Sequence, residues 1–407
     1  MTTSIVLGLG GCLDSELVLD PDVLQDLIDH QDLGTAEITQ PDRITTEREL
    51  LISVLAYLRD GVGGERYIES TRALLAFETR FSRELALGGT NVRAGRVLAK
   101  LGHDNILHVP GRDPEFESLL VDGSEVPPTT PPATYVPHLI VQYPRGLRLR
   151  LRDGAIESPH PNRLIFVNDP VSELTPLHPQ LEDWLGEDGV LTLSGLNSIR
   201  DEQILEERLT TLKGVLDSAP TGLRVLYEDA DYHVPAFRRR VWAELAVRAS
   251  VVGMNEDELA SFTGRPVDIT DPGQIASALH AVLDELPGGT VIVHSKYWAL
   301  AAGLQAAELE QALEVGIAAA GARFVHGDSA DSSSLERVRE MPESTEGVDL
   351  AAELPAFLRC PVVIVPAREL TSAHPTTIGL GDTFLGGLIA GIVDTGAVLD
   401  STEMEHS

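Results

Sequence analysis

The sequence predicts an α/β fold in which helices cover both faces of a mostly parallel sheet. From residue 163 onward, short runs rich in Val, Ile and Leu alternate with amphipathic helical patterns. The run Pro-Val-Val-Ile-Val-Pro at 361–366 is short, apolar and β-branched, which is typical of a buried strand. The segment 379–392 then begins with a glycine turn and continues with apolar residues at helical spacing.

The expected elements follow one another along the chain. A first strand at 4–10 ends in glycines, helical patterns occupy 46–60 and 66–79, and 87–91 opens a further helix. Later strands are expected at 105–109, 163–167, 190–193, 223–228, 250–254, 290–294 and 361–366, with helices such as 201–217 and 274–285 between them. Because parallel strands end at one edge of their sheet, we expect a binding site at that edge.

The segment 111–160 has a different character. A proline-rich connector at 126–132 is followed by pieces that alternate like exposed strands. Leucine and arginine alternate through 146–152, so the leucines should face one side and the arginines the other. The arginine face could bind a substrate phosphate. The commoner alternative is a solvated strand face.

Composition limits the partners and the compartment. A formal charge of −32 over 407 residues argues against nucleic acid and anionic membranes as partners. Cys12 and Cys360 are the only cysteines, too few for a disulfide scaffold, which favours a reducing compartment. The sequence has neither a signal-peptide pattern at its start nor an apolar run of membrane-spanning length. We therefore expect a cytoplasmic location.

The glycine turn Gly379-Leu-Gly-Asp382 is the strongest candidate for chemistry. Glycine allows close backbone approach to a ligand, and the amides and dipole of a helix N-terminus attract phosphate. A carboxylate in such a turn would repel phosphate, but it is suited to take a proton from a hydroxyl that attacks a phosphoryl group. The alternative is that Asp382 only caps the helix.

Two further segments place polar side chains where a strand ends. Asn255-Glu-Asp-Glu258 has the pattern of a capping box. Together with the glycine turn, Asn255 and Glu258 become candidates to hold a magnesium–water shell that faces phosphates. Asp14 follows the first strand, where α/β sheets bind ligands, although it could equally be a turn residue.

These features together resemble the ADP-dependent phosphofructokinase/glucokinase family of the ribokinase-like superfamily. The residues 379–382 match the family's GXGD motif, and 255–258 match its NXXE motif. Weaker similarities lie at 194–197, at 293–300, at 365–368 and in the Gly88-Gly89 pair.

The resemblance implies a ribokinase-like three-layer α/β/α sandwich with a central, mostly parallel sheet and a small β-rich lid domain. The large domain would comprise mainly 1–12, 45–80, 90–125 and 160–400, the lid about 13–44, 80–90 and 126–160, and 400–407 a disordered tail. The lid would close over the sugar and expel water. The chain would be a monomer or a homodimer.

The implied reaction transfers the β-phosphoryl group of ADP to a hydroxyl of a sugar or sugar phosphate, in the glucose or fructose 6-phosphate class. It would need Mg²⁺, yield AMP and belong to carbohydrate metabolism and glycolysis. Asp382 would be the base, and the amides from Gly379 to Gly381 would hold the oxyanion. The implied metal residues are Glu258, Asn255 and Glu228. The implied nucleotide residues are Leu380, His294, Arg368 and Asn197. The implied sugar residues are Asp14, Gly88, Gly89, Asn91 and Gln142. Arg368 would neutralise phosphate charge or form a surface ion pair.

Departures from the family pattern lie mainly at the sugar end. The family's HXE motif aligns with 226–228, which has the glutamate and lacks the histidine. The lid motif His-Tyr-Ile-Phe-Glu is His-Leu-Ile-Val-Gln at 138–142, and Thr90 stands where the amide residue usually follows Gly-Gly. Gly10 and Cys12 take the asparagine positions of the first strand.

Two other functions stay open from the sequence. The first is an ATP-using kinase of the same superfamily. The segment 294–297 favours ADP over ATP as the phosphoryl donor. The second is a ligand sensor that has lost turnover, as the altered sugar end would allow. Retention of Asp382 opposes that interpretation, because a sensor needs no base.

Overall fold

The computed structural model describes residues 3–372, 376 and 378–399. The chain forms two compact units. The large unit comprises Met1–Gly11, Gly89–Ala133 and Ser172–Ser407, and the small unit comprises Cys12–Gly88 and Thr134–Val171. The predicted α/β class is confirmed. None of the helices in the described residues combines the length and apolar character that a membrane span requires.

A mixed sheet forms the centre of the large unit. Within the described residues it has nine strands, in the order β16 (Val362–Pro366), β15 (Trp298–Gly303), β14 (Thr290–His294), β13 (Val251–Asn255), β12 (Arg224–Glu228), β11 (Val190–Leu193), β1 (Ile5–Gly8), β5 (Asn105–His108) and β6 (Ser124–Glu125). Neighbouring strands from β14 to β6 are parallel, whereas β15 is antiparallel to both of its neighbours. The mostly parallel sheet predicted from the sequence is therefore present.

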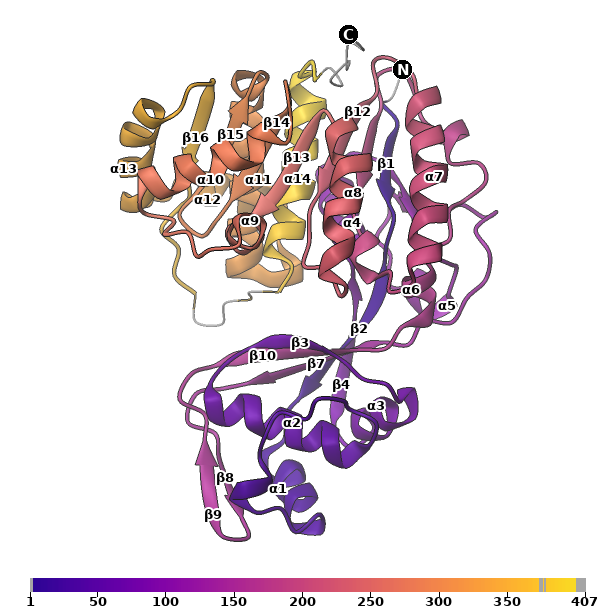
Figure 1. Ribbon diagram of the computed structural model, residues 1–407, viewed down its shortest axis with the longest axis vertical. Coiled ribbons are helices and arrows are strands. Elements are labelled where there is room, and N and C mark those ends of the chain that lie inside the picture. Colours follow the sequence, from indigo (N-terminus) through magenta and orange to yellow (C-terminus); the bar gives the residue numbers. More distant parts are fainter. Residues whose placement is uncertain (1–2, 373–375, 377, 400–407) are drawn as a thin grey trace. The chain divides into compact units, whose positions relative to one another are not determined.

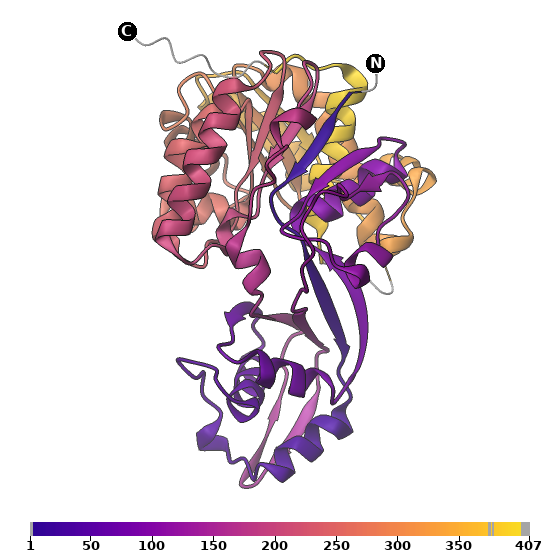
Figure 2. The same ribbon diagram turned by 90° about the vertical axis from the view of Figure 1, so that its right-hand side faces the viewer.

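Helices cover both faces of this sheet (Figure 1), because alternate side chains of each strand point to opposite faces. Val6, Leu191 and Val252 belong to a core that includes residues of α7 (Glu202–Ser218), α8 (Pro235–Glu244), α9 (Glu256–Thr263), α10 (Pro272–Asp284) and α13 (Thr345–Glu353). The other layer contains α4 (Thr90–Lys100), α11 (Glu310–His326), α12 (Ser332–Arg339) and α14 (Leu380–Thr395). In Figure 2 the sheet is seen between the magenta α7 and α8 and the yellow α14.

Shorter elements complete the large unit. They are the helix α5 (Pro114–Ser118), the part of α6 (Pro170–Leu174) from Ser172 onward, and the 3₁₀ turns η2 (Glu182–Trp184), η3 (Leu196–Ser198), η4 (Ala246–Arg248), η5 (Ala306–Leu309), η6 (Gly327–Ser329) and η7 (Leu354–Phe357). Proline opens α5 at its first turn, where a missing amide proton costs no intrahelical hydrogen bond.

The small unit contains a five-stranded sheet in the order β3 (Gly64–Tyr67), β10 (Asn162–Val167), β7 (His138–Tyr143), β2 (Cys12–Val18) and β4 (Ser82–Gly88). One face bears Leu139, Val141 and Phe166, which pack in a core with α1 (Pro21–His30), α2 (Glu47–Asp60) and α3 (Thr71–Glu78). The opposite face carries alternating polar residues, among them Asp14 and His138, which are partners in the β2–β7 register. We call it the polar face of the small sheet.

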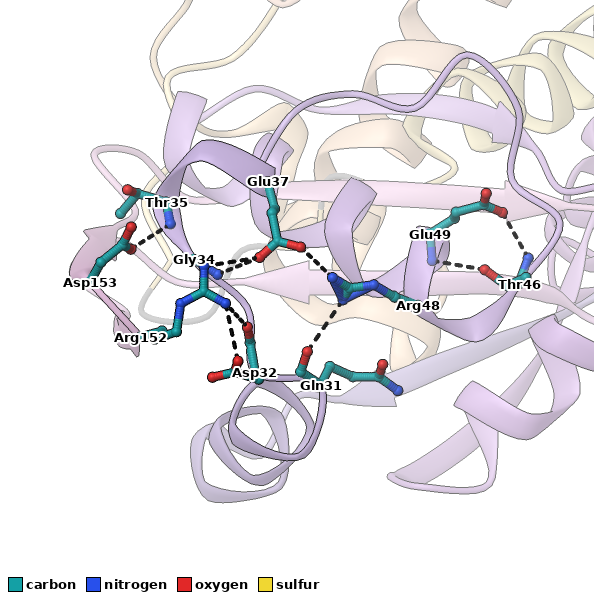
Figure 3. A network of polar contacts seen from close by, with 10 residues as sticks. All are labelled: Gln31, Asp32, Gly34, Thr35, Glu37, Thr46, Arg48, Glu49, Arg152 and Asp153. Carbon is teal, nitrogen blue, oxygen red and sulfur yellow. Dashed lines mark hydrogen bonds and ion pairs between the residues drawn. The ribbon is translucent and has the colours of Figure 1, made fainter.

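The hairpin β8 (Arg148–Leu151) and β9 (Gly154–Glu157) is tied to the small unit by polar contacts (Figure 3). Its leucines are buried and its arginines are exposed, as the alternation predicts. Arg152 Nη1 donates to the Asp32 carbonyl at 2.7 Å, and Asp153 Oδ1 accepts from the Thr35 amide at 2.7 Å. Arg152 therefore takes part in contacts within the unit, which favours the solvated strand face over a phosphate-binding face.

The unit boundaries differ from the predicted domain boundaries. Residues 45–80, predicted in the large domain, belong to the small unit because α2 and α3 bury Leu50 and Phe77 in its core. The expected strand at 163–167 is part of β10, which lies in the small sheet rather than in the parallel series. Its apolar run buries one face against α2 and α3, and such a run does not reveal which sheet it joins. The predicted tail 400–407 lies outside the described residues.

Candidate active site

The glycine turn predicted at 379–382 opens α14. Gly379 is the N-cap residue, and its φ of 66° lies in the left-handed region that favours glycine. Asp382 is the third residue of the helix, so it does not occupy the N-cap position that the capping alternative requires. The first intrahelical bond runs from the Thr383 amide to the Gly379 carbonyl at 3.0 Å. The amides before it lie at a positive helix end, which is suited to bind an anion.

Close packing fixes this helix end in place. A Cβ added at Gly386 would lie 2.6 Å from the Ala94 carbonyl oxygen of α4. At Gly387 it would lie 2.7 Å from the Val315 carbonyl oxygen of α11. Because only glycine allows α14 to approach both helices so closely, α4 and α11 fix the position of α14 about one turn beyond Asp382.

Arg93 of α4 lies beneath the turn. Its side chain is 7% exposed, and its Nε lies 3.7 Å from Asp382 Oδ2. Any side chain at Gly379 would overlap the Arg93 guanidinium. This buried cation offsets the charge of the Asp382 carboxylate and adds to the positive end of the helix, so the turn is suited to receive an anion. Sequence reasoning missed Arg93, because helical periodicity gives no sign of what a residue contacts far along the chain.

A second group of side chains lies where β12, β13 and β14 end. Glu228 ends β12, and His294 ends β14 next to Asn255 of β13. His294 Nε2 lies 3.4 Å from Glu228 Oε1. Gly253 is the β13 partner of Glu228, and a side chain there would overlap the Glu228 carboxylate. The missing side chain of Gly253 therefore makes room for a carboxylate at this edge.

The Asn255–Glu258 capping box is formed. Asn255 Oδ1 accepts hydrogen bonds from the amides of Asp257 and Glu258, each at 2.9 Å, and Glu258 Oε2 accepts from the Asn255 amide at 2.7 Å. The capping function expected as an alternative is thus present. It also holds the Glu258 carboxylate at the carboxyl end of β13, so capping and ligand binding are compatible.

Glu228 is buried, and Glu258 is partly buried. Burial raises the pKa of Glu228, an effect that the nearby His294 opposes. Loss of solvent and the neighbouring Glu228 carboxylate raise the pKa of Glu258 well above its usual range. Two close carboxyl groups with raised pKa values form a site where a divalent cation would stabilise the ionised forms. The oxygen donors fit Mg²⁺.

His294 connects the two groups. A Cβ at Gly381 would lie 3.1 Å from His294 Cε1, and the His294 and Phe384 rings have centroids 4.7 Å apart. The Asp382 charge also contributes to the raised pKa of Glu228. The large unit therefore gathers Arg93, Asp382, His294, Glu228 and Glu258, which we call the α14 site.

Other predicted residues of the large unit have local partners. Arg368 Nη1 donates to Glu343 Oε1 at 2.9 Å, the ion pair weighed as its alternative. Asn197 lies in η3 and donates to the Asp231 carbonyl at 3.2 Å. Asn91 is buried and donates from Nδ2 to the Leu7 carbonyl at 3.2 Å, which ties α4 to β1. Leu380 is the first residue of α14.

The predicted sugar residues lie mostly in the small unit. Asp14, Gly88 and Gln142 belong to the polar face, where Gln142 Nε2 donates to Glu16 Oε2 at 3.3 Å. Gly89 belongs to the large unit, as the N-cap of α4 with a φ of 93°. The chain thus passes between its two units within the Gly-Gly pair.

Solved structures share this fold. A phosphofructokinase from Pyrococcus horikoshii OT3 with AMP is 18% identical at a TM-score of 0.77, over 97% of this chain and 98% of that chain. An ADP-dependent kinase complex with fructose-6-phosphate and ADPβS is 18% identical at a TM-score of 0.74, over 99% and 95%. The last common ancestor of ADP-dependent phosphofructokinases from Methanosarcinales is 18% identical at a TM-score of 0.71, over 98% and 95%. These likenesses confirm the ribokinase-like fold.

No curated protein matches the sequence. The ADP-specific phosphofructokinase/glucokinase conserved region matches residues 3–387. The match covers both units and includes the segments that end in Glu258 and Asp382. The chain therefore belongs to the ADP-specific phosphofructokinase/glucokinase family and is an enzyme of the ADP-dependent sugar kinase class.

Proposed function

We propose that this enzyme transfers the β-phosphoryl group of ADP to a hydroxyl of a sugar or sugar phosphate in the glucose or fructose 6-phosphate class. The products are AMP and the phosphorylated sugar. The observation that carries the proposal is the position of Asp382 in the first turn of α14, beside the helix amides and the buried Arg93. This arrangement combines a base with an anion-binding helix end, as phosphoryl transfer to a hydroxyl requires.

Asp382 accepts the proton of the attacking sugar hydroxyl. The hydroxyl oxygen forms a bond to the β-phosphorus, and the bond from that phosphorus to the bridging oxygen of AMP breaks. Amides at Gly379–Gly381 and the Arg93 guanidinium stabilise the negative charge on the transferred group. Arg93 adds the local positive charge that a polyanionic substrate needs in a chain of formal charge −32.

The family implies Mg²⁺, and Glu228 and Glu258 would hold it, directly or through water, with Asn255 orienting Glu258. The ion would neutralise phosphate charge when bound. His294 contacts Glu228 through Nε2 and packs against the glycine turn with its ring. It would therefore fix the position of the proposed metal residues relative to the proposed phosphate-binding turn.

The sugar would bind through Asp14, Gly88, Gly89 and Gln142, whereas Asn91, 1% exposed, would support Gly89 by tying α4 to β1. A buried carboxylate such as Asp14, 6% exposed, can accept hydrogen bonds from two hydroxyls of a sugar. The similar structures that contain fructose-6-phosphate with ADPβS, and AMP, support a sugar phosphate and an adenine nucleotide as ligands.

The proposal is tested by measuring AMP release from purified protein with Mg²⁺ and ADP, across a panel of sugars and sugar phosphates. We expect AMP formation that depends on one acceptor. ATP is supplied in parallel, and acceptor-dependent ADP formation from ATP, without AMP formation from ADP, would overturn the choice of donor. Tight nucleotide binding without turnover on any acceptor would overturn the kinase assignment.

A further inference from the structure

Three side chains of metal-binding type lie together on the polar face of the small sheet. Cys12 and Asp14 alternate along β2, and His138 of β7 is the register partner of Asp14. Cys12 Sγ lies 3.6 Å from Asp14 Oδ1, and His138 Nδ1 lies 3.9 Å from the same oxygen. One ligand atom from each of the three residues lies within 4.8 Å of the other two.

The third strand of this region leaves space for these atoms. Gly88 of β4 is the register partner of Cys12, and a Cβ there would lie 2.5 Å from both Cys12 Sγ and Asp14 Oδ1. Cys12 and Asp14 are 7% and 6% exposed, while His138 is only partly buried and gives access from solvent. Three hydrogen-bonded strands thus hold a thiol, a carboxylate and an imidazole in a fixed arrangement.

We propose that Cys12, Asp14 and His138 form a binding site for a transition-metal ion of the Zn²⁺ class. Sulfur, nitrogen and oxygen ligands suit Zn²⁺, with bond lengths that place neighbouring ligand atoms about 3.4–3.6 Å apart in a tetrahedron. The two separations from Asp14 Oδ1, 3.6 and 3.9 Å, are within a few tenths of an ångström of these values, and the Cys12 and His138 ligand atoms lie within 4.8 Å of each other. Three protein ligands leave the fourth position for water or a hydroxyl.

This site differs in chemistry from the α14 site. Glu228 and Glu258 offer only oxygen and belong to the large unit, whereas Cys12 offers a sulfur ligand in the small unit. Hard Mg²⁺ prefers the oxygen site, and softer ions prefer the site with a thiolate. The two sites should therefore be separable with metal ions of different softness.

Metal occupancy has a consequence that rests on the proposed function. Asp14 is proposed to bind sugar hydroxyls, so a metal ion on its carboxylate would withdraw it from the sugar. Zn²⁺ would then inhibit in competition with the sugar and not with ADP. Substitutions at this site can also change the kinase rate directly, because Asp14 and its neighbours belong to the proposed sugar site. The inhibition of each variant by Zn²⁺ is therefore measured relative to the rate of the same variant without Zn²⁺.

The test is a titration of the full-length protein with Co²⁺, which reports thiolate ligation by its charge-transfer absorption. We expect one equivalent to produce this absorption in wild type and Zn²⁺ to abolish it. Cys12→Ser should lose the absorption, whereas Cys360→Ser should keep it, since Cys360 is the only other cysteine. Absence of the absorption in wild type, or its loss in Cys360→Ser alone, would overturn the proposal.

His138→Gln provides a second variant that leaves Cys12 in place. We expect its Co²⁺ affinity to fall at least about tenfold, by analogy with the loss seen when supporting residues of metal sites are changed. Unchanged affinity would exclude His138 as a ligand and overturn the three-residue site. The Co²⁺ absorption does not depend on turnover. Its absence in a protein with kinase activity would therefore refute only the proposed metal site. Presence of the Co²⁺ absorption in a protein without kinase activity would refute only the proposed function.

Discussion

Arg93 Nε lies 3.7 Å from Asp382 Oδ2, and the Arg93 side chain is almost fully buried beneath the turn that opens α14. The two residues are 289 positions apart in the sequence but share one anion-binding edge of the large unit. A guanidinium at this position reduces the repulsion between the Asp382 carboxylate and the negative charge of a phosphoryl group. We therefore place Arg93 in the proposed site together with Asp382.

Replacing Arg93 by methionine should remove this charge while keeping most of the side-chain volume. We expect kcat to fall about 10²-fold, because a preorganised charge at the transferred group is lost, with a smaller change in KM for the sugar. Arg93→Lys should recover part of the rate. Equal kcat values for wild type and Arg93→Met, measured as AMP release, would show that Arg93 only supports the fold.

Mg²⁺ binding should release protons from the two glutamates. Because the pKa values of Glu228 and Glu258 are raised, metal binding should compete with protonation of these carboxylates, and the affinity for Mg²⁺ should increase as pH rises. Calorimetry in buffers of different ionisation enthalpy would measure the released protons. Glu258→Gln should bind Mg²⁺ more weakly and release fewer protons, and identical proton release in the variant would argue against this site.

The same glutamates should make metal-free stability fall with rising pH. The folded state of Glu258 keeps a proton that an unfolded glutamate loses near pH 4.3, so the contribution is present below that pH and is lost as pH rises through the raised folded pKa. Buried His108 makes stability rise with pH instead, because burial lowers its pKa to about 4 and the unfolded state binds the proton more readily. Urea unfolding of wild type and Glu258→Gln isolates the glutamate contribution, and parallel pH curves for the two proteins would contradict it.

The packing of α14 predicts a stability effect at Gly386. An added methyl group would lie 2.6 Å from the Ala94 carbonyl oxygen, so Gly386→Ala should cost about 1–3 kcal/mol of unfolding free energy. The shift of the helix should also reduce kcat by moving Asp382. Gly214→Ala is the matched control: this exposed residue of α7 has open space around it and should become more stable by about 0.5–1 kcal/mol. Equal stability of the two variants would contradict the packing argument.

Local pattern was sufficient for the parts of the fold with strong periodicity. The apolar run at 361–366 is the strand β16 apart from its first residue, and the glycine turn at 379 does open a helix. Both depend on residues close in sequence, whose spacing encodes the local structure. The β15 strand was not predicted, because its small residues Ala299, Ala301 and Ala302 resemble a helical segment more than a strand.

The rest of the site depends on contacts that sequence spacing does not encode. Glu228 and His294 meet only because β12, β13 and β14 are neighbours in the sheet. Residues 45–80 were placed in the wrong unit because an amphipathic helix does not specify the sheet that its apolar face covers. Arg93 required knowledge of how α4 packs against α14.

The most direct test of the account is sugar-dependent AMP formation by Asp382→Asn, measured with nucleotide binding in the same preparation. The account predicts a loss of rate of about 10²–10⁴-fold, as expected when a general base is removed. The dissociation constant for ADP should change little, because the helix amides and Arg93 remain. AMP formation at the wild-type rate would contradict the assignment of Asp382 as the base.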